Sequence, residues 1–225
     1  MNAPRVQTIA AKYLDPGSRM GEILFGLIMT LTFTLGAGMV IEEEGREGVR
    51  EMLIAILGCN LAWGVIDGIF YVLGQMFERG RMLRLRLKVR TAGSTDDARA
   101  LVAGELDELI SRVTEEEQRR SLYDTIVQRV RAEPLPFNRL RKDDVLGGLA
   151  AGWLVFACSF PAVLPFFFLD EPRLAVRVSN ILLLLLLFLV GYRFARDTMA
   201  KPWLTGTVFL LVGVVLVAAT IALGG

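Results

Sequence analysis

Long apolar stretches alternate with charged segments along this chain. The apolar stretches, five in number, cover residues 21–41, 52–77, 145–169, 178–192 and 203–223. A helix rises about 1.5 Å per residue and the hydrocarbon core of a bilayer is about 30 Å thick, so about 20 apolar residues can span it. The fourth stretch is short, but Arg177 and Arg193 at its ends can extend to the membrane interfaces. The pattern predicts an all-α membrane protein with five transmembrane helices.

The composition shows that charge is segregated from these stretches. Hydrophobic residues make up 53% of the chain and the mean hydropathy is +0.48, yet 22% of the residues are charged. The polar tail at 1–20 lacks the apolar region of a signal peptide, so we expect none. The predicted organisation is a tail (1–20), two transmembrane helices (21–77), an insert (78–144) and three further transmembrane helices (145–225).

Lysine and arginine predict the orientation in the membrane. Residues 79–90 carry six basic side chains and no acidic one, and the tail and the segment 193–201 are also basic. The first loop, 42–51, has five glutamates against two arginines. Basic loops stay on the cytoplasmic side, so we expect a cytoplasmic N-terminus and insert and an external C-terminus. A bacterial inner membrane is the expected location.

The insert between the second and third stretches is predicted to be a small helical layer. Its basic beginning continues the second transmembrane helix, and Ser94 or Thr95 can cap the next helix. Thr114 and Glu117 fit a capping box that starts another. Each of these helices has an apolar face, and the layer is too short to bury a core alone. We expect it to pack on a second copy of the chain or on the membrane helices.

The carboxylates of the insert are one candidate metal site. Glu105 and Glu108 lie three residues apart on one helix face and could bind a divalent cation with oxygens from the next helix. The predicted metal-binding set is Glu105, Glu108, Glu115 and Glu116. The alternative is an ordinary solvated surface, because several of these glutamates precede an arginine by four residues.

Asp67 is the most unusual residue, because it lies within the second apolar stretch. A charged side chain near the bilayer centre costs about 2.5–3.5 kcal/mol on insertion scales, which makes a role in ion or proton transfer the default hypothesis. Asn60, Trp63, Tyr71 and Gly74 share its helix face. The predicted transport site is Asp67 with Asn60 and Tyr71. A structural lock against a buried partner is the alternative, although no lysine or arginine lies in the predicted spans.

The first apolar stretch offers a matching face. Glu22 at its beginning, together with Glu78 after the second stretch, is predicted to form the cytosolic mouth. Met29 lies near mid-membrane with a thioether that Fe²⁺ tolerates, although packing is the commoner role of such a residue. The chain has no histidine, so a metal site must use carboxylate, amide, carbonyl or methionine ligands. Cys59 and Cys158 are expected to be reduced packing residues.

Residues in the third to fifth stretches resemble the vacuolar iron transporter (VIT) family. Residues 152–166 (GWLVFACSFPAVLPF) are similar to its third helix, with an aromatic, a small residue and two prolines four apart. Gly191-Tyr192-Arg193 with Lys201-Pro202 resembles its fourth-to-fifth connection, and 205–224 its closing helix. The resemblance covers about two-thirds of the chain. It implies a homodimer that exports Fe²⁺ or Mn²⁺ from the cytosol, often against protons, with the insert's glutamates binding metal.

The first two stretches depart from that family's pattern. The family carries an Asn-Asp-Gly-like element in its first span, whereas residues 24–30 contain no acid and an Asp-Gly pair stands at Asp67-Gly68 instead. Our first hypothesis is a divalent cation (Fe²⁺ or Mn²⁺) transporter without a permanently bound cofactor. The alternative is a non-transporting membrane protein whose basic insert binds anionic lipid or a protein partner. Nothing in the sequence supports an enzyme or a nucleic-acid-binding protein.

Overall fold

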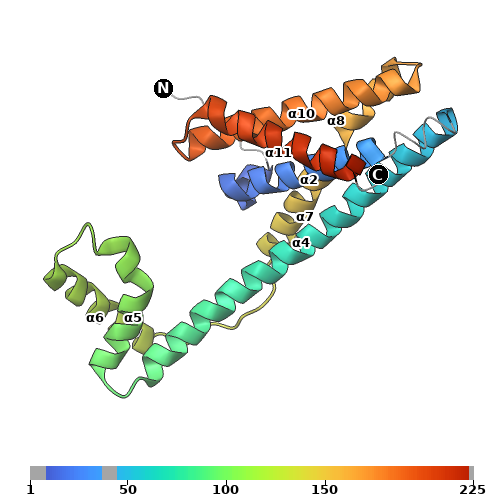
Figure 1. Cartoon of the computed structure of the whole chain (residues 1–225). Helices are drawn as coiled ribbons and strands as arrows, with labels where there is room; N and C mark the ends of the chain where they lie inside the picture. Colours follow the sequence, from blue (N-terminus) through green and yellow to red (C-terminus); the bar gives the residue numbers. More distant parts are fainter. Residues whose placement is uncertain (1–8, 37–44, 223–225) are drawn as a thin grey trace, which may run out of the picture. The chain divides into compact units, whose positions relative to one another are not determined.

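The computed structural model describes residues 9–36 and 45–222, and within these ranges the regular structure is helical throughout. In chain order the helices are α1 (Ile9–Tyr13), α2 (Pro16–Gly36), α4 (Arg46–Thr91), α5 (Thr95–Ile110), α6 (Glu116–Ala132), α7 (Lys142–Ala157), α8 (Phe160–Val163), α9 (Pro165–Phe168), α10 (Pro172–Asp197) and α11 (Pro202–Ala222) (Figure 1). The all-α prediction is confirmed. The end of the first predicted span and residues 42–44 of the acidic loop lie outside the described residues.

The helices form two compact units, which are described separately. The membrane unit comprises residues 1–72 and 142–225 as far as they are described, and the insert unit comprises 73–141. Helix α4 belongs to both, because the boundary falls after Val72. The basic segment 79–90 is therefore a direct helical continuation of the second apolar stretch, as predicted.

Four helical segments are long and apolar enough to cross a membrane, judged over the described residues. They are Pro16–Leu35, Arg46–Thr91, Lys142–Phe168 and Pro172–Asp197, and α11 adds a shorter apolar segment at Pro202–Leu216. The fourth span is longer than its apolar core suggested, since α10 has 26 residues. It extends past Arg177 and Arg193 because helix formation does not stop where the apolar residues do.

The third predicted span is broken rather than continuous. It consists of α7 followed by the short helices α8 and α9, with Pro161 and Pro165 in their first turns. Proline lacks the N–H that a continuous helix needs and clashes with the preceding turn. The buried Ser179 of α10 donates a hydrogen bond to the Ala162 carbonyl (2.9 Å), which ties α10 to the broken segment.

Helix α2 lies at the centre of the membrane unit and contacts α7, α10 and α11. Its Leu27 and Leu31 are buried against Cys158, Leu183 and Leu187. Helices α10 and α11 pack side by side as a hairpin (orange and red in Figure 1). The two helices of the hairpin pack closely where a glycine of one lies against an aromatic ring of the other. A Cβ atom built on Gly206 would lie only 2.7 Å from the Phe188 ring.

Helices α4 and α7 touch through their backbones. A Cβ built on Gly64 would lie 2.5 Å from the carbonyl oxygen of Gly152, and one built on Gly148 would lie 2.6 Å from the carbonyl oxygen of Gly68. Each helix thus contributes two glycines four residues apart, the spacing that lets membrane helices approach closely. The pairing of low with high residue numbers shows that the two helices are antiparallel.

The insert unit has its own small core. Val89 of α4 packs with Ala98 and Val102 of α5 and with Tyr123 and Val127 of α6. Helix α5 begins as predicted, since the Ser94 hydroxyl accepts a hydrogen bond from the Asp97 amide (3.0 Å).

One detail of the insert prediction was wrong. The N-cap of α6 is Glu115, whose amide donates to the Gln118 side chain (3.3 Å), and not Thr114. The reason is that the Thr114 hydroxyl donates instead to the Ile110 carbonyl (2.6 Å) at the end of α5. Leu109 and Val113, at and just after the end of α5, are 73% and 77% exposed, so the predicted packing of this apolar face on a partner stays a prediction.

The α4–α7 contact makes a sharp prediction for stability. Gly64→Ala should lower the free energy of unfolding by about 1–3 kcal/mol, because the added methyl group overpacks a backbone contact. Gly58→Ala is the matched control on the same helix, since a Cβ there meets nothing within 4 Å. That variant should be neutral or more stable by up to about 1 kcal/mol, the difference in helix propensity. Thermal unfolding in detergent measures both; equal unfolding temperatures would contradict the close approach.

Candidate functional site

Polar side chains of α2 and α4 meet along one line, which we call the α2–α4 seam. The contacting pairs, from the beginning of α2 onward, are Glu22–Asp67, Phe25–Trp63, Met29–Cys59 and Thr30–Asn60. Over the first three pairs the residue numbers rise on α2 while they fall on α4, so the two helices run antiparallel. Each of these steps is about one helical turn, or 5.4 Å, and Thr30–Asn60 lies directly beside Met29–Cys59.

The first pair consists of two acidic side chains. The carboxyl groups of Glu22 and Asp67 lie close enough to influence each other electrostatically, although the sequence prediction had placed Glu22 at the cytosolic mouth and Asp67 near mid-membrane. They share one level because α2 begins only six residues before Glu22, so its first turns lie opposite the middle of α4's apolar stretch. Two ionised carboxylates this close repel each other, so the pair suits a shared proton or a bound cation.

Asp67 has unused capacity for such a ligand. Its Oδ2 atom is buried and has no hydrogen-bond partner among the described residues, and its carboxylate forms no ion pair with a described lysine or arginine. Arg19, one turn before Glu22, also leaves its Nε without a partner there. An unsatisfied buried acceptor costs about 1–3 kcal/mol. Within the described part of the chain, therefore, no arginine pairs with Asp67 in a way that would give it a purely structural role.

Two sulfur-containing side chains form another contacting pair of the seam. The Met29 Sδ and Cys59 Sγ atoms lie 3.8 Å apart. One turn nearer to the carboxyl pair, the rings of Phe25 and Trp63 meet edge to face with their centroids 5.5 Å apart. The seam thus alternates between polarizable sulfur, aromatic rings and carboxyl oxygens.

Asn60 forms, with Thr30, the last pair of the α2–α4 seam among the described residues. Its Nδ2 donates to the Thr30 hydroxyl (2.8 Å) and to the Val155 carbonyl of α7 (3.4 Å), and its side chain is fully buried. The Thr30 hydroxyl donates a hydrogen bond to the Gly26 carbonyl (2.7 Å). The Asn60 Oδ1 atom is buried without a hydrogen-bond partner among the described residues, so it could accept from water or coordinate a cation.

Tyr71 and Glu78 do not join this line. The Tyr71 hydroxyl donates to the Tyr13 carbonyl (2.9 Å), and its ring covers Gly147 of α7, so Tyr71 anchors α1 and α7. Glu78 belongs to the insert unit. Its two carboxylate oxygens accept hydrogen bonds from Arg81 at 2.7–3.1 Å, which lowers the pKa of Glu78.

The predicted metal-binding glutamates of the insert are not gathered within one chain. Glu105 forms a two-bond ion pair with Arg81 (3.0 and 2.8 Å). The hydrogen bonds to Glu78 and to Glu105 together raise the pKa of Arg81. Glu108, Glu115 and Glu116 are exposed on α5 and at the start of α6. Within the described residues no three acidic or sulfur side chains cluster in a way that could hold a metal ion.

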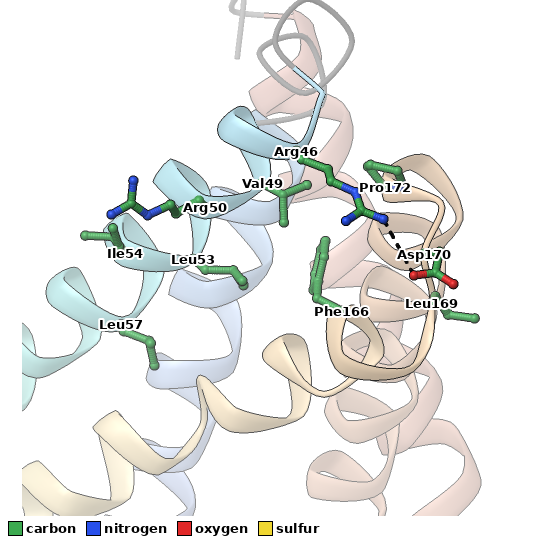
Figure 2. Close-up of a pocket in the computed structure, with 10 residues that line it drawn as sticks. All are labelled: Arg46, Val49, Arg50, Leu53, Ile54, Leu57, Phe166, Leu169, Asp170 and Pro172. Atoms are coloured by element: carbon green, nitrogen blue, oxygen red, sulfur yellow. Dashed lines mark ion pairs between the residues drawn. The ribbon is translucent and has the colours of Figure 1, made fainter.

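A separate groove of about 440 Å³ lies where α4 begins. Figure 2 shows Val49 and Leu53 of α4 turned toward Phe166 of α9, while Arg46 reaches across to Asp170 (3.6 Å). Its floor is apolar, and its one aspartate is paired with an arginine. The groove is therefore a poorer cation site than the carboxyl pair on the seam.

Sequence reasoning missed three members of the seam. Cys59 was assigned to packing, and Phe25 and Thr30 were not among the predicted site residues. The antiparallel arrangement of α2 and α4 could have identified them. When Glu22 is placed opposite Asp67, the two residue numbers of each contacting pair add up to about 89.

The fold and the seam define an integral membrane protein with polar and acidic groups inside its helix bundle. A family model described as the VIT family matches residues 94–225, which is more than half of the chain. The chain belongs to the VIT family, a family of metal-ion transporters and not of enzymes. The match includes α5, α6 and the last three apolar stretches but leaves out the α2–α4 seam. A comparison with curated proteins finds none that matches the chain.

The carboxyl pair should be chemically reactive within the membrane. A hydrophobic carbodiimide attacks protonated carboxyl groups in apolar surroundings, so it should label Glu22 or Asp67 in protein reconstituted into liposomes. Peptide mass spectrometry locates the adduct. Glu22→Gln with Asp67→Asn should remove it, whereas Glu171→Gln, which removes an exposed carboxylate without a capping bond, should not. Labelling confined to surface carboxylates would show that the pair holds no reactive acid.

Proposed function

We propose that this protein transports a divalent metal ion, Fe²⁺ or Mn²⁺, out of the cytosol along the α2–α4 seam. The observation that carries the proposal is the Glu22–Asp67 carboxyl pair with the unsatisfied, buried Oδ2 of Asp67. Membership of the VIT family supports metal-ion transport as the general activity. The particular ion and the direction of transport are those that the resemblance to the family implies, and the ligands of the seam are compatible with these ions.

The ligands of the seam suit these ions. Carboxylate oxygens at Glu22 and Asp67 bind hard and borderline cations, and the thioether of Met29 adds a soft ligand that Fe²⁺ accepts. Thr30 and Asn60 supply neutral oxygens further along. Two carboxylates are too few to strip a hydrated ion completely, so waters and backbone carbonyls complete its coordination.

The carboxyl pair also offers a way to couple metal to protons. With no metal bound, one proton held between Glu22 and Asp67 removes their repulsion. A divalent ion that enters the site displaces this proton, because both carboxylates then serve as ligands. Release of the metal on the far side lets the pair take up a proton there. Exchange of one ion for protons follows from this competition without any further titratable group.

The remaining parts of the protein have proposed supporting roles. Five spans, with the N-terminus and the insert in the cytosol and the C-terminus outside, follow the distribution of basic residues. A homodimer would cover the exposed apolar residues of the insert, among them Leu109 and Val113. It would also supply acidic side chains from a second copy, so that Glu105, Glu108, Glu115 and Glu116 could bind metal jointly before it enters the seam.

Neutralising the carboxyl pair tests the proposed function directly. Asp67→Asn and Glu22→Gln should each slow Mn²⁺ uptake into proteoliposomes by at least about tenfold, because a lost charge in a low-dielectric site is worth more than 1.4 kcal/mol. Both substitutions keep the side-chain size. Glu171→Gln is the control and should leave the initial rate unchanged. Normal flux in both seam variants, with unchanged unfolding temperatures, would exclude the seam as the transport site.

The metal-binding role of the insert has its own test. Replacing all four predicted glutamates with glutamine should weaken Mn²⁺ binding to the full chain in detergent by about tenfold, since carboxylate number sets affinity for such ions. Asp97→Asn with Glu117→Gln is the control, because it removes charge from the same two helices outside the predicted set. Titration calorimetry measures the binding. An equal loss in both variants would point to general electrostatic attraction instead of a site.

A further inference from the structure

The insert unit contains a basic pocket that the transport proposal does not use. The chain from Pro136 to Arg141 runs beside the part of α4 that follows the apolar stretch, and the two enclose about 270 Å³. The pocket is lined by Glu78, Arg79, Met82, Leu83, Arg86, Pro136, Phe137, Asn138 and Arg141.

Specific hydrogen bonds hold this connecting segment on α4. The Asn138 side chain donates to the Met76 carbonyl (2.9 Å) and accepts from the Arg79 Nε atom (3.5 Å). Arg79 donates in addition to the Arg139 carbonyl (3.3 Å). The pocket is therefore held together by side-chain hydrogen bonds, to backbone and to side chain, between two segments far apart in the sequence.

The charge of the pocket is positive. Arg79, Arg86 and Arg141 line it, and the one acidic lining residue, Glu78, already accepts hydrogen bonds from Arg81 through both oxygens. Arg86 is exposed and forms no ion pair with a residue that the structure describes. A guanidinium fork of this kind matches the oxygens of a phosphate group.

The rim of the pocket is apolar in a way that suits lipid. Phe137 is 91% exposed and the nearby Leu140 is 54% exposed, between arginines at 139 and 141. Both walls directly adjoin membrane-capable helices, because α4's apolar stretch ends at Phe77 and α7 begins at Lys142. An exposed aromatic ring beside arginines at such a position is typical of side chains that enter the headgroup region.

We propose that this pocket binds the headgroup of an anionic phospholipid, with Arg86 and Arg141 on the phosphate and Phe137 and Leu140 among the upper acyl-chain carbons. A free phosphate ion would use the arginines but not the exposed ring. The site thereby fixes the two segments that enter the membrane on either side of the insert.

Lipid retention by the full-length protein in detergent tests this assignment. Native mass spectrometry should show phosphatidylglycerol retained in preference to phosphatidylcholine. Arg86→Gln should weaken phosphatidylglycerol binding about fivefold, the usual effect of one basic residue at an anionic surface. Lys88→Gln is the matched control, since it removes the same charge from the same helix outside the pocket, and it should change binding less than twofold. Equal losses in both variants would overturn the site in favour of unspecific attraction.

A second variant separates lipid from free phosphate without risk to the fold. Phe137→Ser alters a side chain that is 91% exposed, so it should leave the unfolding temperature unchanged and still weaken phosphatidylglycerol binding. Met199→Ser, which alters an apolar side chain that is 96% exposed and lies outside the pocket, should have no effect. Full competition by millimolar inorganic phosphate, or normal lipid binding by Phe137→Ser, would refute a phospholipid ligand.

Discussion

The backbone contact between α4 and α7 determines how the polar residues of α4 are arranged. Because Gly64 and Gly68 lie against Gly152 and Gly148, α4 cannot rotate about its axis without driving a side chain into a carbonyl group. Asn60, one turn further on, is thereby directed to the Val155 carbonyl and Thr30. Asp67, beside Gly68, is directed to α2 and Glu22. In a membrane, where apolar side chains gain little by leaving lipid, such close packing is the main source of helix specificity.

The seam that results is incompletely satisfied, and this distinguishes it from the other buried polar groups. Thr34, Ser159 and Ser179 each donate to a carbonyl group, so their polar atoms have partners. The Oδ1 of Asn60 and the Oδ2 of Asp67 have none among the described residues. Leaving acceptors unpaired in an apolar bundle is unfavourable unless something else binds there. Two such atoms on one helix, two turns apart, are better explained by a passing cation or by water than by packing.

The sequence predicted the parts of this arrangement that depend on local pattern. Helical spans, the continuation of α4 beyond the membrane, the Ser94 cap and the exceptional position of Asp67 all follow from residue type and spacing. It did not predict the pairing of Glu22 with Asp67, because that depends on where α2 begins relative to α4. The same limit applies to the glycines. Gly58 and Gly64 look equivalent in the sequence, yet only Gly64 meets a neighbouring backbone. Pro161 and Pro165 are visible in the sequence, but the division of this span into α7, α8 and α9 was not predicted from it.

The lack of histidine gives the carboxyl pair more weight in the proposed mechanism. An imidazole could bind metal and exchange protons near neutral pH by itself, but this chain has none. Among acidic groups, only mutual repulsion or burial keeps a proton bound under such conditions. Glu22 and Asp67 face each other inside the helix bundle. In the mechanism that we propose, a proton and a divalent ion compete for the same oxygens, so one site would both bind the metal and couple its movement to protons.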